Sequence, residues 1–112
     1  MNKIIEDDIS HILNSSILWK KFEGKSILIT GAAGMIPSYL VFTLLTLNKK
    51  ISKKCKIFAL VRNKTKARKL FKNFLNDPSL KIIHQDVIHK IKIKTKINYI
   101  IHGASPADPT YY

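Results

Sequence analysis

Two glycines separated by two alanines, Gly31 and Gly34, are the residues whose spacing points most directly to chemistry. They follow the apolar run Ile27–Thr30, which is typical of a strand buried on both faces, and they precede a stretch that suits a helix. Glycine can adopt a positive φ or let another group approach the backbone closely. The first N–H groups of a helix have no intrahelical partner, and with the positive end of the helix dipole they suit a pyrophosphate. We therefore predict a phosphate-binding turn formed by these residues: Gly31, Ala33, Gly34, Met35 and Ile36.

A second group of candidate residues follows the next predicted strand, 56–61, where the chain reads Arg62-Asn63-Lys64. A dinucleotide site that selects NAD usually places an acidic residue there, on the 2′-hydroxyl of the ribose. Arg62 and Lys64 suit the 2′-phosphate of NADP instead, because basic side chains form charge-assisted hydrogen bonds with phosphate. A solvated basic turn is the alternative interpretation. The predicted cofactor is therefore NAD or NADP.

The elements that would position these residues alternate between strand and helix. Strands are predicted over 26–30, 56–61, 80–85 and 97–102, while 88–96 fits either a short strand or part of a helix. A helix over 34–48 has a predicted sheet-facing side made of Ile36, Leu40, Val41, Leu44 and Leu45. A helix over 64–75 has a predicted buried stripe made of Ala67, Leu70, Phe71 and Phe74. This alternation predicts an α/β protein, a partial Rossmann fold whose parallel sheet has strand order 3-2-1-4 and is flanked by helices.

The pattern of the first part of the chain predicts a helix that packs on the rest of the domain and has no catalytic or binding function. Apolar residues recur at helical spacing over 6–20, and Gly24 is a plausible helix stop. We therefore divide the chain into an N-terminal packing helix, 1–23, and a dinucleotide-binding part, 24–112.

Composition and charge restrict the possible partners. The 112 residues carry a net charge of +13, which invites a nucleic-acid function. However, all but two of the basic residues are lysines, and they are spread along the chain rather than gathered with aromatic side chains. We therefore predict no nucleic-acid partner. No apolar run is long enough to span a membrane, and no secretory signal is present. Cys55 lacks the partners of a metal site, and His11, His84 and His89 lack metal-ligand spacing. These features predict a cytoplasmic protein without a metal site or membrane partner.

Three stretches resemble the extended short-chain dehydrogenases/reductases, the NAD-dependent epimerase/dehydratase family. Thr30–Pro37 resembles the TGxxGxxG fingerprint of that family, with Pro37 in place of its third glycine. Asp86-Val87 resembles the pair that contacts the adenine. The run His102–Pro109 resembles the end of the fourth strand in nucleotide-sugar decarboxylases and dehydratases, where it passes near the nicotinamide ribose.

The resemblance implies a set of cofactor-binding residues and a reaction. Beside the residues named above, it adds Asp86, Val87, Gly103, Ala104 and Ser105 to the cofactor site. It implies transient oxidation of a nucleotide sugar at C4 by a full-length enzyme that is a homodimer. The catalytic Tyr-x-x-x-Lys pair of the family does not occur in this sequence. We therefore expect either the N-terminal half of a longer enzyme or a truncated gene product, with no catalytic residue in this chain and no turnover by the isolated chain. A thioester-reductase-type NADPH domain, suggested by Leu60-Val61-Arg62 before a basic helix, and a non-catalytic NADP-sensing module are the alternatives.

Overall fold

A computed structural model describes residues 3–4, 21–84 and 93–103 of the chain. The predicted helix over 6–20 lies outside the described residues. The described elements are strand β1 (Ser26–Thr30), helix α2 (Met35–Asn48), strand β2 (Lys56–Val61), helix α3 (Lys64–Leu70), the 3-10 turn η2 (Lys72–Phe74), and strands β3 (Leu80–His84) and β4 (Tyr99–His102). The predicted alternation of strands and helices is confirmed.

The four strands form one all-parallel sheet with the order β3-β2-β1-β4. This is the predicted order, so the partial Rossmann arrangement is confirmed. Strand β1 lies in the interior, and all five of its residues are buried. In its pairing with β4, Leu28 lies opposite Ile100 and Thr30 lies opposite His102. The carboxyl ends of β1 and β4 therefore lie next to each other.

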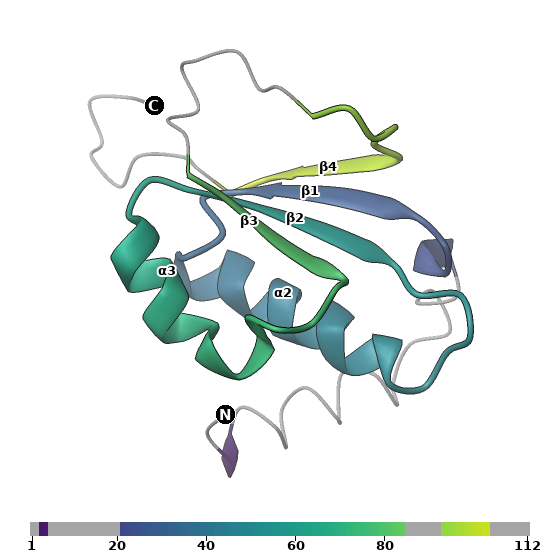
Figure 1. Cartoon of the computed structure of the whole chain (residues 1–112), viewed down its shortest axis with the longest axis horizontal. Coiled ribbons are helices and arrows are strands. Elements are labelled where there is room, and N and C mark those ends of the chain that lie inside the picture. The colour runs from purple at the N-terminus through teal and green to yellow at the C-terminus, as the bar shows by residue number, and fades with distance from the viewer. Residues whose placement is uncertain (1–2, 5–20, 85–92, 104–112) are drawn as a thin grey trace.

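Helices α2 and α3 cover one face of the sheet (Figure 1). Their apolar residues and those of β1 and β2 that point toward them form the main core, with Ile29, Val41, Leu44 and Phe71 fully buried. The rings of Phe42 and Phe71 meet edge to face, with centroids 5.4 Å apart. Area buried in this way is the main stabilising contribution in a domain of this size. The core therefore holds α2 firmly against the strand that leads into the glycine turn.

The C-terminal end of α2 is fixed by a buried side chain. Asn48 donates to the carbonyl oxygen of Cys55 at 2.9 Å and accepts from the N–H of Cys55 at 2.8 Å, so its amide replaces a backbone partner just before β2. Lys54 caps the same helix end by donating from Nζ to the carbonyl oxygens of Asn48 and Ile51. Burial raises the pKa of the Cys55 thiol to about 11. This cysteine is therefore an inert packing residue.

Three details of the sequence-based prediction are wrong. Ile36 is 80% exposed rather than sheet-facing, because it lies in the first turn of α2, beyond the end of the strands. Leu70 is 36% exposed, because α3 ends there and the chain continues into η2, which changes the angular spacing of side chains. Strand β4 begins at Tyr99 rather than at residue 97, since the side chain of Asn98 accepts from the N–H of Ser26 in place of a ladder bond.

Candidate functional site: a glycine turn at the switch point of the sheet

The order of the strands creates a crevice at one defined place. From β1 the chain adds β2 and then β3 on one side, whereas β4 lies on the other side of β1. The strand order therefore reverses between β1 and β4. In open α/β sheets, ligands bind outside the carboxyl ends of the strands at such a switch point. Both Gly31 and Gly103 directly follow strands that end there.

The glycine turn that follows β1 has the geometry of a phosphate cradle. Gly31 has a φ of +61°, a conformation that favours glycine, and its carbonyl oxygen accepts from the N–H of Gly34 at 2.9 Å. Gly34 is then the N-cap of α2, and it has no side chain to cap the helix. Within the described part of the chain, the N–H groups of Ala33, Met35 and Ile36 have no hydrogen-bond partner. Of the five residues predicted for the phosphate-binding turn, Ala33, Met35 and Ile36 therefore have open N–H groups, while the N–H of Gly34 is used inside the turn.

The third fingerprint position is filled by Pro37, which lies in the first turn of α2 and has no N–H. Its ring packs against Gly103: a Cβ atom added to Gly103 would lie only 2.4 Å from Cγ of Pro37 and 2.8 Å from the carbonyl oxygen of Thr30. The close contact that the third glycine normally permits between helix and sheet is therefore made possible by Gly103.

Thr30 and His102 connect the two strand ends beside the turn. The N–H of Gly103 donates to the side-chain oxygen of Thr30 at 3.0 Å, and this oxygen lies 2.9 Å from Nδ1 of His102. Thr30 is only 2% exposed, and Nδ1 is the acceptor available to its hydroxyl proton in the described structure. This network fixes the end of β4 to the end of β1.

The end of β2 carries the positive charge predicted for the adenosine side. Arg62, Asn63 and Lys64 are all exposed, and Asn63 is the N-cap of α3, with its side-chain oxygen accepting from the N–H of Lys66 at 3.0 Å. His84, at the end of β3, donates from Nε2 to the carbonyl oxygen of Arg62 at 2.9 Å. Sequence reasoning missed this contact, because the two residues are 22 positions apart and no local pattern indicates that they meet.

Four predicted site residues cannot be placed. Asp86 and Val87, expected at the adenine, and Ala104 and Ser105, expected near the nicotinamide ribose, lie outside the described residues. Their roles remain predictions. Among residues 3–4, 21–84 and 93–103, no group of His, Cys, Asp and Glu is arranged to hold a metal ion.

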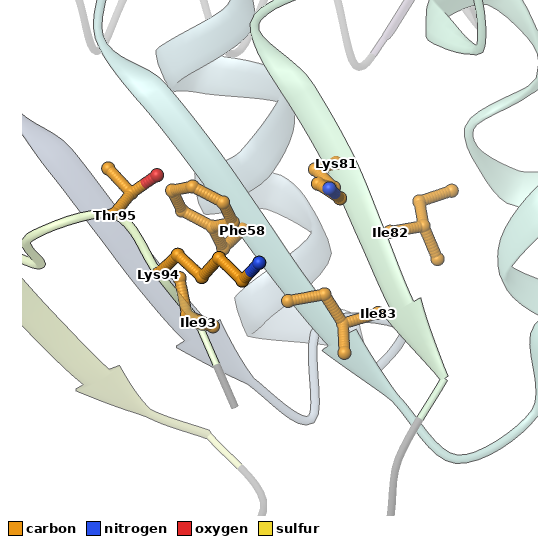
Figure 2. Close-up of a pocket in the computed structure, with 7 residues that line it drawn as sticks. All are labelled: Phe58, Lys81, Ile82, Ile83, Ile93, Lys94 and Thr95. Carbon is orange, nitrogen blue, oxygen red and sulfur yellow. The ribbon is translucent and has the colours of Figure 1, made fainter. Parts of the chain in front are cut away.

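A separate hollow of about 530 Å³ lies on the sheet face opposite the helices (Figure 2). Phe58, Ile83 and Ile93 line it, and Lys81 and Lys94 bring ammonium groups to it from β3 and from the segment before β4. Phe58 and Lys81 pair in the middle of their strands, not at the carboxyl ends. The hollow is therefore distinct from the crevice at the switch point, and its described lining contains no imidazole or carboxylate.

A glycine turn with open N–H groups, set between a buried strand and a helix at the switch point of a parallel sheet, defines a dinucleotide-binding domain of the Rossmann type. Residues 29–105 match the profile of an NAD-binding family described as male sterility protein. This match covers more than half of the chain, so the chain belongs to that family, which is of the extended short-chain dehydrogenase/reductase type. No curated protein matches the chain. Within the described residues, no helix is both long and apolar enough to cross a membrane.

Proposed function

We propose that this chain is the NADP(H)-binding portion of a reductase. The run Leu60-Val61-Arg62 before the basic helix α3 resembles thioester reductases and favours a thioester as the substrate class of the enzyme. Membership of the NAD-binding family supports two statements: the cofactor is a dinucleotide, and the chain is the cofactor-binding portion of a reductase- or dehydrogenase-type enzyme. The observation that carries the proposal further is the exposed, basic end of β2, where Arg62 and Lys64 stand at the position of the acidic residue that selects NAD. When bound, the dinucleotide supplies the hydride, and the chain holds its phosphates.

The residues present fit that cofactor. The N–H groups of Ala33, Met35 and Ile36 would bind the pyrophosphate, and the N-terminal end of the 14-residue helix α2 adds its dipole. Arg62 and Lys64 would bind the 2′-phosphate. Asp86, Val87, Ala104 and Ser105 remain proposed contacts to the adenine and to the nicotinamide ribose.

The choice between NADP and NAD bears on the type of reaction. An enzyme that takes a hydride from its substrate and returns it in the same turnover needs no reducing pool, as in the nucleotide-sugar chemistry implied by the resemblance. A net reductase consumes NADPH in every turnover. The basic end of β2 therefore favours a reductase, while the sequence run His102–Pro109 keeps a nucleotide-sugar epimerase, dehydratase or decarboxylase as the second candidate.

Titration of the chain with NADPH and with NADH, followed by cofactor fluorescence, tests the proposal. We expect saturable binding of both, with NADPH bound roughly tenfold more tightly, about 1.4 kcal/mol. Equal affinities, or a preference for NADH, would contradict the reductase proposal and favour the nucleotide-sugar candidate. Absence of binding by a chain that is folded by circular dichroism would overturn the cofactor site itself.

A further inference from the structure

We propose that Pro37 and Gly103 are a size-matched pair that positions the first turn of α2 against the end of β4. Pro37 occupies the position of the third fingerprint glycine, and Gly103 provides the space that this exchange requires. The inference rests on the proposed function in one respect: the turn that the pair positions is the turn that would bind the pyrophosphate.

The contact between the two residues leaves no room for a side chain. A Cβ atom on Gly103 would lie 2.4 Å from Cγ and 3.1 Å from Cβ of Pro37, and 2.8 Å from the carbonyl oxygen of Thr30. Two of these distances are shorter than real Cβ contacts, so a substitution must move the proline ring or the backbone. Overpacking of this kind destabilises a core.

Neither partner can move away cheaply. The N–H of Gly103 donates to both the carbonyl and the side-chain oxygen of Thr30, each at 3.0 Å, and Thr30 is buried. On the other side, the ring of Pro37 fixes its own φ, and the turn around it is closed by the bond from the N–H of Ser38 to the carbonyl oxygen of Gly34 at 2.9 Å. A larger residue at 103 would therefore push the whole first turn of α2.

The consequence for binding follows from which groups would move. The open N–H groups of Met35 and Ile36 belong to the same turn as Pro37. A displacement of that turn changes their positions relative to the end of β4, across which the dinucleotide would lie. Pro37 and Gly103 are therefore positioning residues for the phosphate cradle.

A double-mutant cycle tests the pair, using the 112-residue chain as wild type, Gly103→Ala, Pro37→Gly and the double variant. We expect Gly103→Ala to lower Tm by roughly 10 °C or to prevent folding. When residue 37 is glycine, Gly103→Ala should lower Tm by less than half as much as it does in the wild type. The loss that is left would come from the contact of the added Cβ with the carbonyl oxygen of Thr30. Pro78→Gly, an exposed proline in the loop before β3, is the matched control and should not rescue Gly103→Ala.

The affinity for NADPH is measured as well, because a pair that only stabilises the fold would change Tm without changing this affinity in the folded variants. At a temperature where all folded variants remain native, we expect Gly103→Ala to weaken binding at least about fivefold, and to have less than a twofold effect when residue 37 is glycine. If Gly103→Ala does not fold, recovery of a folded, binding protein in the double variant supports the pair. Additive changes in Tm and affinity, or no recovery, would overturn it. Coupled changes in Tm without any NADPH binding by the wild type would instead refute the proposed function and leave the pair intact.

Discussion

The chain contains the same unit twice: a strand that leads through a short turn into a helix. The two units differ in the residue that caps the start of the helix. At the junction of β1 and α2, the N-cap is Gly34, which offers no side chain to the helix. At the junction of β2 and α3, the N-cap is Asn63, whose side-chain oxygen accepts from the N–H of Lys66. The first helix start is left open, whereas the second is closed by its own sequence.

We infer from this difference that the first junction is the one open to a ligand. An asparagine cap satisfies one of the orphan N–H groups of a helix and stabilises it by about 1 kcal/mol. The first junction lacks such a cap. Helix α2 is stabilised instead by the hydrogen bonds along its 14 residues and by its buried contacts with the sheet. Open N–H groups in a helix that does not need a cap are available to a phosphate.

The two junctions also differ in the groups that could attract an anion. No charged side chain occurs between Ile29 and Asn48, so the first junction offers only N–H groups and the helix dipole. The second junction carries the charges, with Arg62 and Lys64 at the turn and further basic residues along α3. We infer that the first junction binds the phosphates common to both cofactors and that the second distinguishes NADP from NAD.

The largest expected effect comes from placing the same negative charge at each junction in turn. We expect Gly34→Asp to weaken binding of both NADH and NADPH at least about tenfold, because the carboxylate would occupy the open N–H groups and repel the pyrophosphate. The added Cβ would lie 3.2 Å from the carbonyl oxygen of Gly31, so Tm is measured in parallel to exclude unfolding. Asn63→Asp is the matched control, which keeps the cap and should leave NADH affinity within about twofold of wild type. Equal losses from the two variants would contradict the assignment.

Removing charge from the second junction should have a smaller and more selective effect. We expect Arg62→Ala to weaken NADPH roughly fivefold and NADH less than twofold, because only NADPH carries the 2′-phosphate. The contact is exposed, so the difference should shrink as salt is raised from about 0.05 M to 0.5 M. Lys69→Ala, which removes a charge near the other end of α3, is the control for a general change of charge. An equal loss of affinity for both cofactors would mean that Arg62 does not bind the 2′-phosphate and belongs to a solvated basic turn.

The smallest expected effect comes from removing the cap of the second helix. Asn63→Ala should lower the free energy of unfolding by about 1 kcal/mol, since the N–H of Lys66 loses its acceptor. The affinity for NADH should stay within about twofold of wild type, because this junction is not expected to contact the phosphates that the two cofactors share. Chemical denaturation and an NADH titration measure the two quantities separately. A large loss of NADH affinity in a stably folded variant would mean that the second junction also holds the common phosphates.

The sequence predicted these two junctions well, because each is encoded locally. A buried strand, a glycine turn and a helix pattern lie within a few residues of one another, and the alternation of such units implies a parallel sheet. The exposed side chain of Ile36 could not be predicted, since periodicity does not show where a helix passes beyond the end of the sheet. The packing of Pro37 on Gly103 and the contact of His84 with Arg62 join distant positions in the chain, and no local pattern specifies them.

We expect the open junction of β1 and α2 to bind the dinucleotide, and the capped junction of β2 and α3 to distinguish NADP from NAD. Amide chemical shifts of the ¹⁵N-labelled chain, recorded while NADH and then NADPH are added, test this residue by residue. We predict saturable shifts at Ala33, Met35 and Ile36 with both cofactors, and shifts around Arg62 and Asn63 that are larger with NADPH. Saturable binding that shifts α3 but leaves the amides of Ala33, Met35 and Ile36 unchanged would contradict the account.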